Sequence, residues 1–191
     1  MAPDAIGSHI FTESTNTMKK ITALSALALL AACVVAVPAW SAEIKEAPAF
    51  SVSTDTGELN LADFRGKTVY LDFWASWCGP CRASFKWLNE AHEKYASKGL
   101  VIIAINVDTD KALAARFLKE NPVDFRIGYD PNGKVAETYQ LKGMPSSYMI
   151  DRNGKLHVTH VGYRAKDKEA LEEELQKLLA DDGVVVGSAG H

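Results

Sequence analysis

Val-Tyr-Leu-Asp-Phe-Trp-Ala-Ser-Trp-Cys-Gly-Pro-Cys occupies residues 69–81 of this chain. Its first six residues form a short, mainly apolar run that suits a central parallel strand. Its last four residues place two thiols at C-x-x-C spacing, directly before an amphipathic helical pattern. The stretch therefore predicts a strand, a tight turn, and a helix that begins at the first cysteine.

The two cysteines of this stretch have the spacing of a reactive dithiol. A thiol at a helix N-terminus faces unpaired backbone N–H groups and the positive end of the helix dipole, and both favour the thiolate. We expect Cys78 to be the attacking sulfur and Cys81, one turn further and more buried, to resolve the mixed disulfide. A structural zinc site would need a second ligand pair at similar spacing, and the remaining cysteine is Cys33, near the N-terminus. Redox chemistry is the favoured interpretation.

Asp72 is the one acid within the apolar run. A buried carboxylate is costly unless it has a partner or a function. If Asp72 lies beneath the disulfide, desolvation raises its pKa and it can exchange protons with the Cys81 sulfur. The alternative is an edge-facing acid in solvent.

Residues 72–81 resemble the active-site segment of thioredoxin, and Gly143-Met144-Pro145 resembles the loop that carries the thioredoxin cis-proline. The sequence pattern over the longer range, from about residue 47 to 180, is more similar to the TlpA/ResA-like branch of periplasmic thiol-disulfide oxidoreductases. Its marks are Ala49-Phe50, Gly57, the run from Leu61 to Lys67 and a helical insertion near residues 108–120. ResA-like members tend to have Asn in place of Asp72 and Glu in place of Ser84, so their substrate preferences transfer poorly.

The resemblance also implies how a substrate is bound. Pro145 is expected to have a cis peptide bond, to pack against the disulfide, and to leave the preceding backbone free to pair with an extended substrate chain. A trans proline in an ordinary turn is the alternative. The expected substrate-binding residues are Trp77, Gly79, Pro80, Met144 and Pro145. Trp74 and Trp77 flank the dithiol, where an exposed indole could bind unfolded peptide, and packing is the alternative role for Trp74. Trp87 is expected to be structural.

The fold class expected is α/β: a thioredoxin-like central mixed sheet with helices on both faces, an extra N-terminal strand segment and the helical insertion. Apolar patterns predict strands at residues 68–74 and 100–107, a hairpin of residues 147–150 and 155–161, and helices at 80–97, 111–120 and 166–180. In the helix at 111–120, Leu113, Phe117 and Leu118 are expected to face the core. The predicted domains are an upstream extension and signal peptide (1–42), the thioredoxin-like domain (43–182) and a flexible tail (183–191).

The N-terminal region predicts export. Met18-Lys19-Lys20 and the apolar stretch from Ile21 to Val37 have the charged and apolar regions of a secretory signal, with cleavage near Ser41 or Ala42. A transmembrane anchor is the alternative, although the stretch is at the short limit for a bilayer. Residues 30–33, Leu-Ala-Ala-Cys, resemble a bacterial lipobox, so the domain is expected in the periplasm, either soluble or lipid-anchored through Cys33.

The net charge and the spacing of the histidines bear on whether the chain binds nucleic acid or a metal ion. The chain has 21 Lys and Arg against 24 Asp and Glu, a net charge of -3, and nothing in it indicates nucleic-acid binding. His157 and His160 are three apart on an expected strand, so they point to opposite faces and chelate one metal poorly. A copper chaperone that uses Cys78, Cys81 and a histidine is the binding-protein alternative. No metal site and no cofactor other than the Cys78–Cys81 disulfide are expected.

These features predict an exported thiol-disulfide oxidoreductase that reduces disulfides of periplasmic proteins as a monomer. The Gly-Pro pair between the cysteines resembles that of reducing thioredoxins, and an exported reductase needs a membrane thiol-transfer protein as its electron donor. Candidate substrates are apocytochrome c, as in cytochrome c maturation, a copper-site cysteine pair and damaged secreted proteins. An oxidase or isomerase of secreted proteins is the runner-up. A peroxidase is disfavoured, because peroxiredoxin-like chains share the overall sequence pattern of this domain but lack its tryptophan-flanked dithiol.

Overall fold

The computed structural model describes residues 45–181. The predictions made for the leader, for Cys33 and for the C-terminal tail lie outside these described residues. Within residues 45–181, no helix is both long and apolar enough to cross a membrane.

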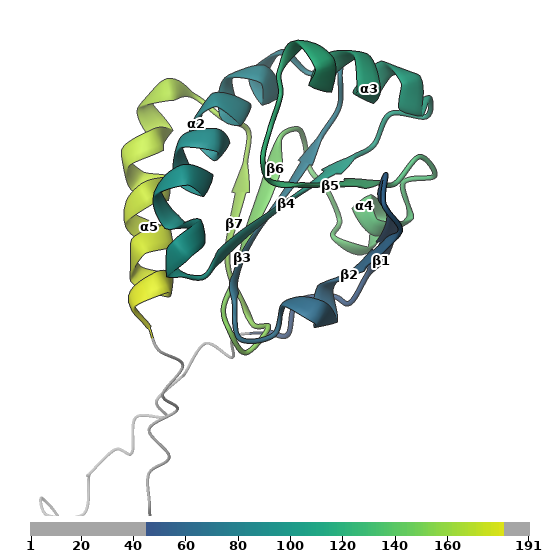
Figure 1. The fold of residues 1–191 in the computed structure, drawn as a ribbon. Helices are drawn as coiled ribbons and strands as arrows, with labels where there is room; N and C mark the ends of the chain where they lie inside the picture. Colours follow the sequence, from purple (N-terminus) through teal and green to yellow (C-terminus); the bar gives the residue numbers. More distant parts are fainter. Residues whose placement is uncertain (1–44, 182–191) are drawn as a thin grey trace, which may run out of the picture. The chain divides into compact units, whose positions relative to one another are not determined.

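A seven-stranded mixed sheet with the order β2-β1-β5-β4-β3-β6-β7 forms the centre of the described domain (Figure 1). β3, β4 and β5 are mutually parallel, whereas β6, β7 and the β1–β2 hairpin run antiparallel to their neighbours. The central strands β3 and β4 are almost wholly buried, as their near-continuous apolar sequence predicts. The strands are β1 (Ser51–Ser53), β2 (Glu58–Asn60), β3 (Thr68–Trp74), β4 (Leu100–Asn106), β5 (Arg126–Tyr129), β6 (Ser146–Ile150) and β7 (Leu156–Val161).

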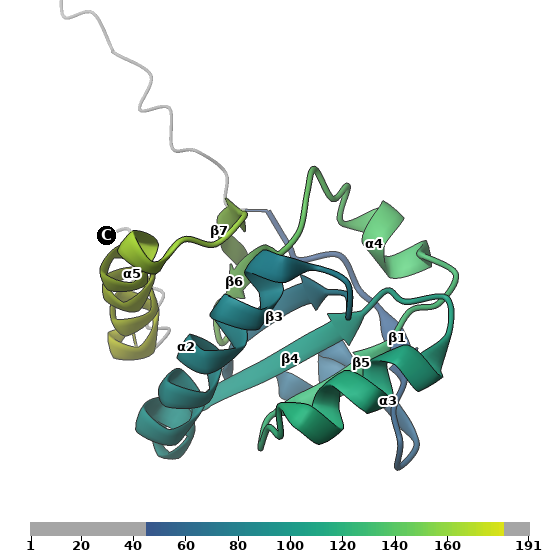
Figure 2. The same ribbon diagram turned by 90° about the horizontal axis from the view of Figure 1, so that it is seen from above.

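Helices cover both faces of the sheet (Figure 2). The face that carries Tyr70, Trp74 and Ile102 packs against α2, α3 and α5, and the face that carries Leu71, Phe73 and Ile103 packs against α4 and the N-terminal segment. The helices are α2 (Gly79–Tyr95), α3 (Lys111–Glu120), α4 (Lys134–Thr138) and α5 (Lys168–Ala180), and short 3-10 helices span Leu61–Phe64, Ala96–Lys98 and Ala165–Asp167. Two apolar layers therefore enclose β3, the strand that leads into the cysteines.

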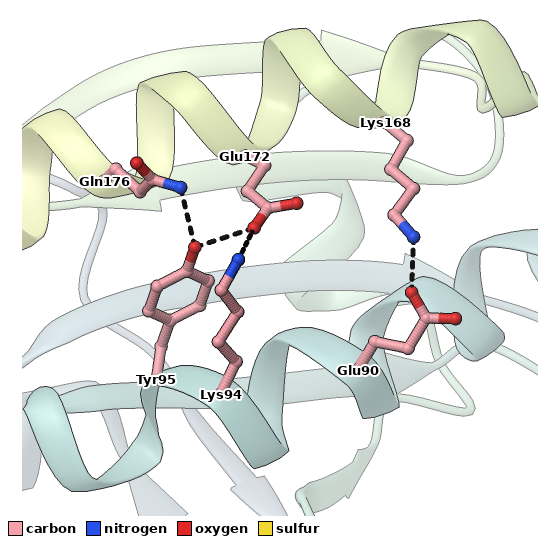
Figure 3. A network of polar contacts seen from close by, with 6 residues as sticks. All are labelled: Glu90, Lys94, Tyr95, Lys168, Glu172 and Gln176. Atoms are coloured by element: carbon pink, nitrogen blue, oxygen red, sulfur yellow. Dashed lines mark hydrogen bonds and ion pairs between the residues drawn. The ribbon is translucent and has the colours of Figure 1, made fainter.

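Polar contacts hold α5 against α2 (Figure 3). The Tyr95 hydroxyl accepts a hydrogen bond from Gln176 Nε2 at 2.7 Å and donates one to Glu172 Oε1 at 2.7 Å. Lys94 pairs with the same Glu172 carboxylate, and Lys168 pairs with Glu90 nearer the start of α2. Since Tyr95 is itself buried, its hydroxyl fixes how the C-terminal helix lies along α2.

The predicted fold class is confirmed, and so are the main elements, with ends that move by one or two residues. The extra N-terminal strand segment is the β1–β2 hairpin, and the helical insertion contains α3. One predicted core residue is wrong: Leu113 is 37% exposed, and Ala114 takes its place against the sheet. β5 was not predicted, because a four-residue strand with Arg126 and Gly128 carries little apolar signal.

Candidate active site

Cys78 and Cys81 form a disulfide at the N-terminus of α2. Cys78 is the N-cap residue, and its sulfur accepts a hydrogen bond from the backbone N–H of Cys81 at 3.3 Å. Pro80 occupies the first turn, where a missing N–H costs nothing. The first turn of α2 contains no acidic residue. Unpaired N–H groups and the helix dipole therefore act on the Cys78 sulfur without a competing carboxylate, an arrangement that favours a thiolate there.

The two sulfurs differ in access. Cys81 is fully buried, whereas Cys78 is 5% exposed and lines a surface groove of about 630 Å³. Trp77, beside it, is 68% exposed. The groove is lined by Trp77, Cys78, Gly79, Pro80, Val107, Leu141, Lys142, Gly143 and Met144. Four of the five expected substrate-binding residues thus meet around the accessible sulfur, and the fifth, Pro145, follows Met144 directly.

Pro145 has the expected cis peptide bond to Met144. Its carbonyl oxygen accepts a hydrogen bond from Gly162 N at 2.7 Å, and the Ser146 hydroxyl donates to Gly143 O at 2.7 Å, so the loop is held from both sides. The β6 ladder begins at Ser146 and leaves Met144 outside it. The loop therefore presents Met144 to the groove next to Cys78.

Asp72 is buried, with 1% of its surface exposed. It lies on the face of β3 that also carries Tyr70 and Trp74, the face covered by α2 and its cysteines. The Ser147 hydroxyl on β6 donates to Asp72 Oδ1 at 3.2 Å, and Oδ2 has no hydrogen-bond partner among the described residues. Desolvation raises the pKa of Asp72 from 3.8 to about 8, and the Ser147 contact opposes that rise. The alternative of a solvated acid is thereby excluded.

Trp74 and Trp87 pack within the core, which is the structural role expected for Trp87 and one of the two roles considered for Trp74. Trp74 is fully buried and its ring lies 4.8 Å from that of Phe85 and 4.9 Å from that of Phe117. Trp87 packs edge-on against Tyr70 at 5.3 Å. These contacts fix the start of α2 on β3, and with it the position of the disulfide.

A buried polar cluster under the active-site loop was missed by the sequence analysis. The Asp108 carboxyl accepts hydrogen bonds from Ser76 N at 2.9 Å, Ser76 Oγ at 3.1 Å and Asn106 Nδ2 at 2.8 Å. Asp108 N in turn donates to Asn106 Oδ1 at 3.0 Å. A signal was present in the sequence: Asn106 ends β4, the strand parallel to β3, and Asp108 lies two residues beyond it. The carboxyl ends of parallel strands lie at one edge of a sheet. The cluster anchors the loop that carries Trp77 and Cys78.

A larger hollow, of about 820 Å³, lies away from the disulfide between the β1–β2 hairpin and the starts of β4 and β5. Its lining contains acids such as Asp55 and Asp124 and no cysteine. Within residues 45–181, no group of three or more His, Cys, Asp or Glu residues could hold a metal ion. The reactive chemistry of the described domain is concentrated at the smaller groove.

Comparison with known proteins agrees with this geometry. The family model named Redoxin matches residues 42–179. The chain belongs to the Redoxin family. It is 38% identical to the thiol-disulfide oxidoreductase ResA of Bacillus thuringiensis subsp. konkukian over 135 residues, which are 70% of this chain and 77% of that protein. Within the thioredoxin superfamily the chain is thus a TlpA/ResA-like thiol-disulfide oxidoreductase, as the sequence resemblance implied.

Solved structures give the same result for this redoxin. A putative thiol:disulfide interchange protein DsbE from Chlorobium tepidum is 47% identical, with a TM-score of 0.70 and coverage of 71% of this chain and 96% of that one. The pneumococcal exposed lipoprotein thioredoxin of Streptococcus pneumoniae is 31% identical, with a TM-score of 0.56 and coverage of 69% of this chain and 100% of that one. Both match the domain that carries the cysteines.

Proposed function

We propose that this oxidoreductase is exported and reduces disulfides of periplasmic proteins by two-step exchange at Cys78 and Cys81. The observation that carries the proposal is the position of the dithiol. Cys78 caps a helix and opens onto an apolar groove, whereas Cys81 is buried behind it on the side of Asp72. An accessible nucleophile with a shielded second thiol is what a mixed-disulfide mechanism requires.

The reaction begins from the reduced dithiol. The Cys78 thiolate attacks one sulfur of a substrate disulfide, a new S–S bond forms, and the other substrate sulfur leaves as a thiolate. Cys81 then loses its proton to the Asp72 carboxylate and attacks Cys78, which releases the second substrate thiolate and leaves the Cys78–Cys81 disulfide. Asp72 suits the role of base because its pKa of about 8 lies near working pH.

Substrate binding follows from the loop before β6. Met144 lies outside the ladder and lines the groove beside Cys78, so an extended substrate chain can pair with its backbone as an added strand. Trp77, Gly79 and Pro80 line the same groove as Met144. Main-chain pairing gives affinity with little sequence selection, which suits an enzyme that meets several disulfide-bearing proteins.

An exported reductase needs a route out of the cytoplasm and a source of electrons. The leader directs export, and Cys33 provides a lipid anchor if the lipobox is used; the lipoprotein thioredoxin from Streptococcus pneumoniae is a similar protein whose name records such an anchor. A membrane thiol-transfer protein returns electrons to the Cys78–Cys81 disulfide. Apocytochrome c, copper-site cysteine pairs and damaged secreted proteins are the proposed substrate classes.

The direction of electron flow is tested by the redox potential of the dithiol. Reducing thioredoxins lie near roughly -270 mV and a strong periplasmic oxidant near about -120 mV. Because Gly79-Pro80 is the dipeptide of the reducing type, we expect equilibration of the purified exported domain with glutathione buffers to give a value near the reducing end. A value above about -150 mV would support the oxidase or isomerase function instead.

A further inference from the structure

The Asp72 carboxyl is held by a single side chain from the neighbouring strand. Asp72 on β3 and Ser147 on β6 are directly paired in the antiparallel register, and both are buried. Ser147 Oγ donates to Oδ1 at 3.2 Å. On the other side of Asp72, the paired residue of β4 is Ala104, which offers neither charge nor hydrogen bond. Ser147 is thus the one hydrogen-bond donor to this carboxyl within the described domain.

The other titratable groups near this pair come from several elements. Tyr70 lies two residues before Asp72 on the same face; burial raises its pKa, the Asp72 charge adds to this rise, and Ser147 opposes it. His160 on β7 is the residue paired with Ser147, and its ring nitrogen lies 3.9 Å from Asp167. Tyr163 and Glu174 raise the pKa of Tyr70, and Cys81 lies in the same buried cluster as Tyr70. None of the ion pairs among the described residues involves Asp72, so no neighbouring cation replaces the serine.

We propose that Ser147 is the positioning residue of the proton-transfer step: it binds Oδ1 of Asp72 and leaves Oδ2 as the oxygen that takes the proton of Cys81. The unpartnered, buried Oδ2 supports this division of roles between the two oxygens. In the step itself, the S–H bond of Cys81 breaks, an O–H bond forms at Oδ2, and the sulfur keeps the electron pair with which it attacks Cys78. The inference rests on the proposed role of Asp72.

Removal of the serine hydroxyl has a defined electrostatic consequence. A hydrogen bond to a carboxylate stabilises the charged form, so its loss raises the pKa of Asp72 further. A bond to a charged group corresponds to a shift of about one to two pH units. For each unit, the fraction of Asp72 that is ionised at pH 7 falls about tenfold, and the rate of the resolving step falls with it.

The first test uses no turnover. We would follow the Asp carboxyl ¹³C resonances of the oxidised protein against pH, and assign Asp72 from the resonance that disappears in Asp72→Asn. In this state the two cysteines are joined and do not titrate. Ser147→Ala should raise the Asp72 midpoint by about one unit or more, and Ser147→Thr, which keeps a hydroxyl, should restore it. An unchanged midpoint in Ser147→Ala overturns the proposal.

The second test measures the resolving step in single turnover from pH 5 to 10. Asp72→Asn should slow this step by about 10²–10⁴-fold at neutral pH. Ser147→Ala should move the rate profile to higher pH in the parent protein and change nothing further in Asp72→Asn. Equal slowing by Ser147→Ala in both backgrounds overturns the proposal, because it indicates a structural role. A shifted midpoint with an unshifted rate profile overturns both this proposal and the role of Asp72, and leaves disulfide exchange by the cysteines intact.

Discussion

The buried carboxyl of Asp72 makes stability depend on pH in an unusual direction. Its folded-state pKa of about 8 lies above the ordinary value of 3.8. Between these two values the folded protein keeps a proton that the unfolded chain releases, so this group lowers the free energy of unfolding as pH rises from about 4 to 8. Below that window it has no such effect, and above it the loss is complete.

Asp72→Asn should remove this pH-dependent loss while it keeps the shape of the side chain. Each pKa unit corresponds to roughly 1.4 kcal/mol, so the gain in unfolding free energy should increase steadily between pH 4 and 8 and then level off. Urea unfolding of the oxidised parent and variant at pH 4, 6 and 8 measures it. A stability difference that stays constant across these pH values would show that Asp72 is ionised in the folded protein at low pH.

At the residue scale, prediction from sequence was correct where one residue differs in polarity from its neighbours. An acid within an apolar strand predicts both burial and a raised pKa, and both are found at Asp72. Ser147 could not be found in this way, because a serine near a strand end is unremarkable until the register of β6 against β3 is known. Pairing between strands 75 positions apart is a tertiary property that local patterns do not encode.

At the scale of elements, the loop between β3 and α2 depends on the strand beside it. Asp108, two residues after the end of β4, accepts two hydrogen bonds from Ser76 and a third from Asn106. Its burial means that the loss of the carboxyl leaves several donors without partners. The position of Cys78 at the start of α2 is therefore set partly by a residue 30 positions further along the chain.

Asp108→Ala should lower the free energy of unfolding by about 3 kcal/mol, because buried donors lose their acceptor. Asp110→Ala is the matched control. Asp110 is the exposed N-cap of α3 and accepts one hydrogen bond, from Ala112 N, so its loss should cost about 1 kcal/mol. Urea denaturation of both variants measures the loss in free energy of unfolding. Equal losses would mean that the Asp108 cluster contributes no more to stability than an ordinary helix cap.

Elements with strong periodic patterns were predicted well, and short ones were not. β3, β4, α2 and the β6–β7 hairpin follow from apolar runs and turn residues. β1 and β2 have three residues each and could be expected only from the family resemblance. Leu113 was misplaced because Ala114 and Phe117 are the buried residues of α3, and the side of a helix that faces the sheet is set by packing as well as by its own sequence.

At the scale of the whole molecule, topology brings three distant segments to one place. β3 and β4 are parallel, so the active-site loop and the Asn106–Asp108 segment lie at the same edge of the sheet. β6 runs antiparallel to β3 and pairs Ser146 with Phe73, so the cis-proline loop before it lies at that edge as well. These segments meet at the groove beside Cys78, whose lining includes Val107 and Met144.

Reduction of insulin disulfides by dithiothreitol, followed for the purified exported domain and two cysteine variants, tests the central claim most directly. The parent should catalyse the reaction, and Cys78→Ser should abolish catalysis because the accessible nucleophile is gone. Cys81→Ser should also fail to turn over, and should instead accumulate a mixed disulfide between Cys78 and insulin, visible by mass spectrometry under non-reducing conditions. Unchanged turnover in Cys78→Ser would contradict the account.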